Sequence, residues 1–97
     1  MSDSIDMLVV DDPPLFRQGV VHLLELDPAF RVVGETASGE EALQLARALL
    51  PDAVLLDVSM PGWGGIVTAE KIAIACPATA IVMLTVSEAD RRRRRRR

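Results

Sequence analysis

Three aspartates stand out in this sequence because they lie just after short apolar runs. Asp11 and Asp12 come after residues 5–10, and Asp57 comes after residues 53–56. Neighbouring carboxylates repel one another, so an acid pair at the end of a buried segment needs a positive partner. The loops that carry these aspartates contain no lysine or arginine. Oxygen ligands of this kind suit a hard divalent cation that keeps several waters, which favours Mg²⁺.

Each aspartate taken alone has an ordinary structural interpretation, because aspartate caps helices and begins turns. The pair together with a third aspartate at an equivalent position favours the metal site instead. Convergence requires the two apolar runs to form neighbouring parallel strands, since the carboxyl ends of parallel strands share one edge of a sheet. The sequence then predicts that the metal serves chemistry at Asp57.

The order of the predicted elements supports such a sheet. Apolar or β-branched runs alternate with helix-like stretches, and the connections are short, which predicts an α/β fold with right-handed crossovers. The continuous apolar run at 53–56 is typical of a central strand covered on both faces. The more polar run at 30–36 is typical of an edge strand. The predicted strands are residues 5–10, 30–36, 53–56 and 80–85, and the predicted helices are residues 14–26, 38–50 and 64–76.

Apolar spacing predicts the buried face of each helix. Ser38 and Glu41 have the spacing of a capping box at the start of the second helix. The predicted buried residues are Phe16, Val20, Leu23 and Leu24 in the first helix, Ala42, Leu45, Ala46 and Leu49 in the second, and Ile66, Ala69 and Ala73 in the third.

Composition bounds the function classes. The 97 residues are 49% hydrophobic, which fits one small domain with a real core. Residues 91–97 are seven arginines; without them, the 11 basic residues fall to four against 14 acidic ones, a net charge of −10. An acidic body does not suggest a nucleic-acid surface, and we expect the arginine tract to be a disordered appendage.

The lone Cys76 is expected in the core. No run is long enough to cross a membrane and no basic signal sequence opens the chain, so we expect a cytoplasmic protein.

The motifs "LVVDDPPLFRQGV", "VVGETASGEEALQLA", "PDAVLLDVSMPGWGG" and "IVMLTVSE" resemble a bacterial response-regulator receiver domain. The resemblance covers residues 5 to about 90 and is strongest to the subfamily with a LuxR-type helix-turn-helix output domain. It implies a flavodoxin-like doubly wound parallel sheet of order 2-1-3-4-5, here lacking the last strand and helix. It also implies that a sensor histidine kinase donates a phosphoryl group to an aspartate and that Mg²⁺ is required.

The resemblance assigns a role to each site residue. Asp57 is the implied phosphoacceptor. Asp12 is implied to ligate Mg²⁺ directly, Asp11 to act mainly through bound water, and the main-chain carbonyl of Ser59 to be a further ligand. Thr85 matches the switch hydroxyl at the end of the fourth strand, which is expected to hydrogen-bond the new phosphoryl group.

This sequence departs from the family pattern at several positions. Pro13 replaces the histidine common after the acid pair, and Gly64 replaces an aspartate, so the third helix is expected to start less firmly. Trp63 on the same loop is interpreted as an exposed hydrophobe, with a lid or contact residue as the alternative. The family lysine that follows the fifth strand has no counterpart. We therefore expect residues 1–90 to form an incomplete receiver domain and 91–97 to form a tail. The uncovered edge at 80–85 is expected to lead to association into a homo-oligomer, to domain swapping or to partial disorder.

Three functions compete. The first is a phosphoacceptor signalling module that is not an enzyme and that reaches DNA only through an output domain. The second is a Mg²⁺-dependent phosphohydrolase; that class needs a second acid two residues after the nucleophile, where this chain has Ser59. The third is a non-switching fragment that acts as an interaction module. The lone His22 has no partner at ligand spacing and is interpreted as a helix-surface residue rather than a phosphorelay histidine.

Overall fold

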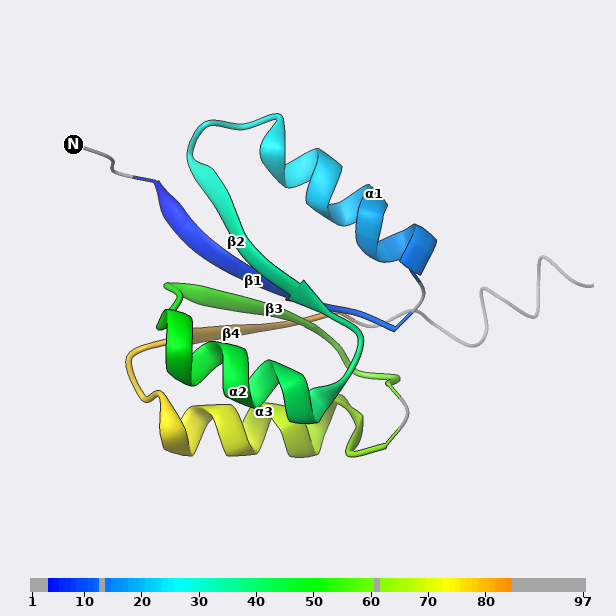
Figure 1. Cartoon of the computed structure of the whole chain (residues 1–97), viewed down its shortest axis with the longest axis vertical. Coiled ribbons are helices and arrows are strands. Elements are labelled where there is room, and N and C mark those ends of the chain that lie inside the picture. Colours follow the sequence, from blue (N-terminus) through cyan, green and yellow to red (C-terminus); the bar gives the residue numbers. More distant parts are fainter. Residues whose placement is uncertain (1–3, 13, 61, 85–97) are drawn as a thin grey trace, which may run out of the picture.

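A computed structural model describes residues 4–12, 14–60 and 62–84, in which strands and helices alternate along the chain (Figure 1). Every described boundary agrees with the sequence prediction to within one residue, and residue 85 of the predicted last strand lies outside the described residues. The elements are β1 (Ile5–Val10), α1 (Pro14–Glu25), β2 (Phe30–Thr36), α2 (Gly39–Leu49), β3 (Ala53–Asp57), α3 (Gly64–Ala75) and β4 (Ala80–Leu84).

The described strands form one parallel sheet in the order β2-β1-β3-β4. Helix α1 lies on one face of the sheet, and α2 and α3 lie side by side on the other (Figure 1). This confirms the predicted flavodoxin-like, doubly wound arrangement and the edge position of β2. The pairing of β1 with β3 brings the carboxyl ends of these two strands together, which is the condition that the predicted site requires.

The main core fills the space between the sheet and the pair α2 and α3. Alternate side chains of β1 and β3 point into it, and the small alanines of α2 let that helix lie close to the strands. Cys76 is buried there at the end of α3, as predicted from its apolar surroundings. The buried core residues are Leu8, Val10, Ala42, Ala46, Val54, Leu56, Met60, Ile72 and Cys76.

The predicted buried face of α3 is wrong at two of its three residues; only Ala69 is half-buried and packs against the core. The helix buries Gly65, Thr68 and Ile72, whereas Ile66 is 62% exposed and Ala73 is also exposed. Apolar residues occur all round this helix, so their spacing does not select one face. The buried face is set instead by the close contact of α3 with the end of β3, because a Cβ on Gly65 would overlap the main chain of Asp57 and Val58.

Two other predicted core positions are also exposed. Leu23 of α1 is 67% exposed, because it lies on the side of the helix turned away from β1 and β2, while Val20 and Leu24 are half-buried. Leu49 in the last turn of α2 is 40% exposed, close to the left-handed residue Leu50 that ends the helix. The side chain of Phe16 lies outside the described residues.

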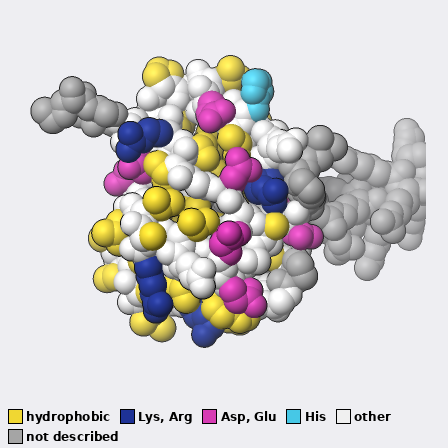
Figure 2. Space-filling view, in the orientation of Figure 1, with side chains coloured by type: hydrophobic (Ala, Val, Ile, Leu, Met, Phe, Trp, Pro, Cys, Tyr) yellow, Lys and Arg dark blue, Asp and Glu magenta, His cyan; other side chains and the backbone are white. Residues whose placement is uncertain are grey.

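Charged side chains are scattered over the face shown in Figure 2. Acidic and hydrophobic groups alternate across it, and the lysine and arginine side chains drawn there stand apart from one another. This face of the described residues therefore presents no continuous basic patch. The arginine tract at 91–97 lies outside the described residues.

The contact between α2 and α3 yields a stability prediction. A Cβ on Gly39 would overlap the hydroxyl of Thr68, which is held by a 2.7 Å hydrogen bond to the Gly64 carbonyl, and would lie 3.3 Å from Trp63 Cε3. We predict that Gly39→Ala lowers the free energy of unfolding by about 1–3 kcal/mol, because the crowded contact outweighs alanine's helix preference. Urea denaturation measures this change.

Gly19→Ala is the matched control. Gly19 lies within α1, and no atom lies within 4 Å of the position of an added Cβ. Helix propensity alone predicts a gain of about 0.5–1 kcal/mol there. A gain in stability in both variants would contradict the close approach of α2 to α3.

Candidate functional site

The ends of β1 and β3 bring two of the three predicted aspartates together. Val10 pairs with Leu56 in parallel register, so Asp11 and Asp57 follow at neighbouring positions. Asp11 is only 1% exposed, whereas Asp57 is half-buried. The predicted convergence of Asp11 and Asp57 is therefore confirmed at the level of the sheet.

The Asp11 carboxyl group is electrostatically strained. Both of its oxygens are buried and accept no hydrogen bond from the described residues. Burial raises the pKa of Asp11 from 3.8 to about 6, the nearby Asp57 carboxyl adds to this rise, and the Asp12 main chain and Arg17 oppose it only in part. A buried, unpartnered carboxylate beside a second carboxylate fits a divalent cation, which would supply the missing positive charge.

The third aspartate is placed differently. Asp12 is exposed, and residues 4–12, 14–60 and 62–84 contain no group of three or more His, Cys, Asp or Glu side chains arranged to hold a metal ion. The structure thus assembles a pair of carboxylates rather than the predicted three. The Mg²⁺ ligand set of Asp11, Asp12, Asp57 and the Ser59 carbonyl stays a prediction.

The turn after β3 orients Asp57. The Ser59 N–H donates a 2.9 Å hydrogen bond to Asp57 Oδ1, so the main chain folds back over the carboxylate. The residue between them, Val58, donates its N–H to the Leu84 carbonyl at 3.0 Å and accepts from the Gly65 N–H at 3.0 Å. Asp57 is thereby fixed between the end of β4 and the start of α3.

The rest of this loop corrects one prediction and supports another. Trp63 is half-buried, and Lys71 Nζ lies 4.8 Å from the centroid of its ring, so the interpretation as an exposed hydrophobe is wrong. No side chain caps the start of α3, as expected from glycine at position 64, where φ is 77°.

Thr85 and Pro13 lie outside the described residues. His22 is exposed on α1, which confirms the surface interpretation.

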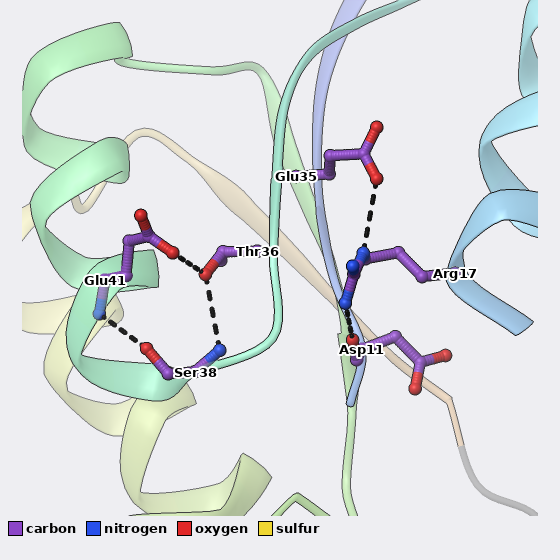
Figure 3. A network of polar contacts seen from close by, with 6 residues as sticks. All are labelled: Asp11, Arg17, Glu35, Thr36, Ser38 and Glu41. Carbon is purple, nitrogen blue, oxygen red and sulfur yellow. Dashed lines mark hydrogen bonds and ion pairs between the residues drawn. The ribbon is translucent and has the colours of Figure 1, made fainter. Parts of the chain in front are cut away.

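Sequence reasoning missed a basic residue that reaches the site from α1. Arg17 Nη1 donates a 2.8 Å hydrogen bond to the main-chain carbonyl of Asp11, and Arg17 Nε donates to Glu35 Oε1 at 3.2 Å (Figure 3). The Asp11 side chain extends away from the guanidinium (Figure 3). The available signal was the place of Arg17 in the first turn of the helix that follows the acid pair.

The end of β2 supplies the other support. Thr36, which is 4% exposed, accepts the Asp11 N–H on its main-chain carbonyl at 3.1 Å. Only half of the predicted capping box forms, because the Ser38 N–H donates to the Thr36 hydroxyl at 3.3 Å and not to the Glu41 carboxylate. The Thr36 hydroxyl donates to that carboxylate instead (Figure 3). Ser38 Oγ accepts the Glu41 N–H as predicted, at 3.1 Å. Thr36 thus links the acidic site to the start of α2.

The raised pKa of Asp11 gives a pH-dependent prediction. The folded protein favours the protonated Asp11 carboxyl. Protonation of Asp11 therefore stabilises the fold fully at pH values below the pKa of Asp11 in the unfolded chain, and this stabilisation is lost as the pH rises through about 6. Without divalent cations, Asp11→Asn should therefore raise the free energy of unfolding by about 1–3 kcal/mol at pH 7. The gain should fade toward pH 4, as measured by denaturation at several pH values. A gain that does not change with pH would contradict the assigned cause.

Comparisons with known proteins match this geometry. Residues 7–96 match the family model of the response regulator receiver domain. The chain is 45% identical over 86 residues to response regulator GacA of Pseudomonas viridiflava, covering 89% of this chain and 40% of that protein. It is 41% identical over 81 residues to the nitrate/nitrite response regulator protein NarL of Escherichia coli K12, covering 84% and 38%. The chain thus spans about two fifths of the length of these curated relatives.

Solved structures agree. The crystal structure of a LuxR-family two-component response regulator from Aurantimonas sp. SI85-9A1 superposes with a TM-score of 0.83 at 35% identity, covering 88% of this chain and 61% of that one. The family match extends over both strand ends that carry Asp11 and Asp57. The chain therefore belongs to the family of response regulator receiver domains.

Proposed function

We propose that this chain is the phosphoacceptor module of a two-component response regulator and not an enzyme that turns over a substrate. In this proposal a sensor histidine kinase transfers a phosphoryl group to Asp57. The observation that carries it is the half-buried Asp57 at the end of central strand β3, beside the buried and unpartnered Asp11. Membership of the receiver family supports the same role.

The geometry supports a simple displacement at phosphorus. The Ser59 N–H holds Asp57 Oδ1 at 2.9 Å, which orients the other carboxylate oxygen as the nucleophile. That oxygen forms a bond to phosphorus as the bond from phosphorus to the donor's imidazole nitrogen breaks, and the nitrogen then takes up a proton. Asp11, Asp12, Asp57 and the Ser59 carbonyl would hold Mg²⁺, which when bound neutralises the negative charge of the carboxylates and phosphoryl oxygens.

We assign the switch hydroxyl to Thr85. The residue before it, Leu84, accepts the Val58 N–H at 3.0 Å directly after Asp57. This contact ties the described end of β4 to the loop of the phosphoacceptor, and it supports a role for the next residue in sensing the phosphoryl group. Thr85 itself lies outside the described residues.

The partners follow from the family. GacA and NarL are response regulators and the Aurantimonas protein is of the LuxR family, so we propose that this module controls transcription through an output domain outside this sequence. We propose no membrane partner; no helix within the described ranges is long and apolar enough to span a bilayer. The cytoplasmic location expected from the sequence stays a prediction.

A second candidate function, self-association without switching, is favoured by one observation. On β4, at the end of the described sheet, Val82 is 46% exposed and Met83 is 36% exposed. Apolar side chains on a strand at a sheet edge favour pairing with another copy. Sedimentation equilibrium with and without a phosphodonor separates this candidate from a module that switches on phosphorylation.

Phosphorylation of the chain tests the main proposal. Incubation with a small acyl phosphate and Mg²⁺ should add one phosphoryl group to the intact mass, and Asp57→Asn should abolish the adduct. Asp52→Asn is the matched control, because Asp52 is an exposed aspartate just before the opposite end of β3. An adduct that persists in Asp57→Asn would refute the assignment. Absence of the adduct from the unmodified chain would favour the interaction module, and hydrolysis of phosphate esters would favour an enzyme.

A further inference from the structure

The main chain of Asp11 is held on both sides by groups attached to β2. Its N–H donates to the Thr36 carbonyl at 3.1 Å, and its carbonyl accepts from Arg17 Nη1 at 2.8 Å. Arg17 is in turn fixed to Glu35, the neighbour of Thr36, at 3.2 Å (Figure 3). Two consecutive residues of the edge strand β2 thus anchor Asp11, the acidic residue that follows β1.

Arg17 is unusual because it lies beside a buried carboxylate without pairing with it. Its side chain is only 18% exposed, yet neither Asp11 carboxylate oxygen has a hydrogen-bond partner among the described residues. An unrestrained guanidinium would form charge-assisted hydrogen bonds with such a carboxylate. Here Nη1 donates to the Asp11 carbonyl and Nε donates to Glu35, while neither Asp11 carboxylate oxygen is bonded to the guanidinium.

We propose that Arg17 is a positioning residue that fixes the Asp11 main chain, and that Glu35 holds the guanidinium away from the Asp11 and Asp57 carboxylates. The purpose is to present both carboxylates, correctly placed and unneutralised, to a divalent cation. This inference rests on the proposed function in one respect, since the cation is taken to be Mg²⁺.

The direction in which Mg²⁺ affinity changes when the Arg17 charge is removed distinguishes a positioning role from a purely electrostatic one. As a nearby positive charge alone, Arg17 would repel the cation, so Arg17→Gln would strengthen Mg²⁺ binding. As a positioning residue, its loss weakens binding because the Asp11 main chain is released. Arg17→Lys keeps the charge but lacks the planar fork that serves the carbonyl and Glu35 together, so it should resemble Arg17→Gln.

Magnesium titration of the full chain, followed by Trp63 fluorescence, measures the effect. We expect the dissociation constant to rise about tenfold in Arg17→Gln and in Arg17→Lys, as for loss of other groups that orient metal ligands. Arg31→Gln is the matched control: Arg31 bonds both oxygens of Asp6, at 2.9 and 3.0 Å, at the opposite end of the same strand pair. It should change the constant less than twofold. Tighter binding in Arg17→Gln, or binding by Arg17→Lys equal to that of the unmodified chain, would overturn the proposal.

The role of Glu35 has its own test. Glu35→Gln should weaken Mg²⁺ binding in the unmodified chain but have no further effect in an Arg17→Gln background, because it acts through the guanidinium. A plain charge effect would instead lower affinity equally in both backgrounds. Equal effects would show that Glu35 does not restrain Arg17.

Amide hydrogen exchange in Mg²⁺-free buffer gives a readout that does not depend on the metal. The Asp11 N–H should exchange roughly tenfold faster in Arg17→Gln, since the charged hydrogen bond to its carbonyl is lost, and should be unaffected in Arg31→Gln. If the unmodified chain binds no Mg²⁺, the proposed metal site fails while exchange still decides the role of Arg17. Unchanged exchange in Arg17→Gln would overturn the positioning role.

Discussion

Repulsion between Asp11 and Asp57 is the constraint on which the rest of this structure depends. The parallel pairing of β1 with β3 forces the two carboxyl groups to the same edge, and burial of Asp11 removes the water that would otherwise screen them. Burial is the larger cause and the neighbouring Asp57 carboxyl the smaller one, and together they raise the pKa of Asp11 to about 6. The apolar residues of both strands must supply enough burial to offset this cost, which a domain of this size can bear only at a few positions.

The surrounding residues hold these carboxylates in place without neutralising them. Asp11 is fixed through its main chain by Thr36 and Arg17, and Asp57 is oriented through one oxygen by the Ser59 N–H. Glu35 bonds the Arg17 guanidinium, which could otherwise form an ion pair with the Asp11 carboxylate. In the proposed function, a divalent cation bound between the two carboxylates would offset their repulsion, so the same ion would affect both stability and phosphorylation.

The sequence was most informative where chemistry and periodicity coincide. Strand and helix alternate with short connections, which predicted a parallel sheet with the aspartates at one edge. The neighbouring places of β1 and β3, which bring Asp11 and Asp57 together, were implied only by the resemblance to the receiver family. The buried face of α3 did not follow, because apolar residues surround that helix and contact through Gly65 decides its orientation. Arg17 was missed for a similar reason: its place in the first turn of α1 brings it near the acid pair, but its contact with Asp11 depends on how that helix packs.

The dependence of the unfolding free energy on Mg²⁺ concentration near neutral pH tests the central claim most directly. If Asp11 and Asp57 bind a cation, the unmodified chain should become steadily more stable as the Mg²⁺ concentration rises through the millimolar range, because the ion binds the folded state alone. Asp11→Asn should show a much smaller rise, since it lacks one of the two facing carboxylates. An equal rise in both proteins, or no rise in the unmodified chain, would contradict the account.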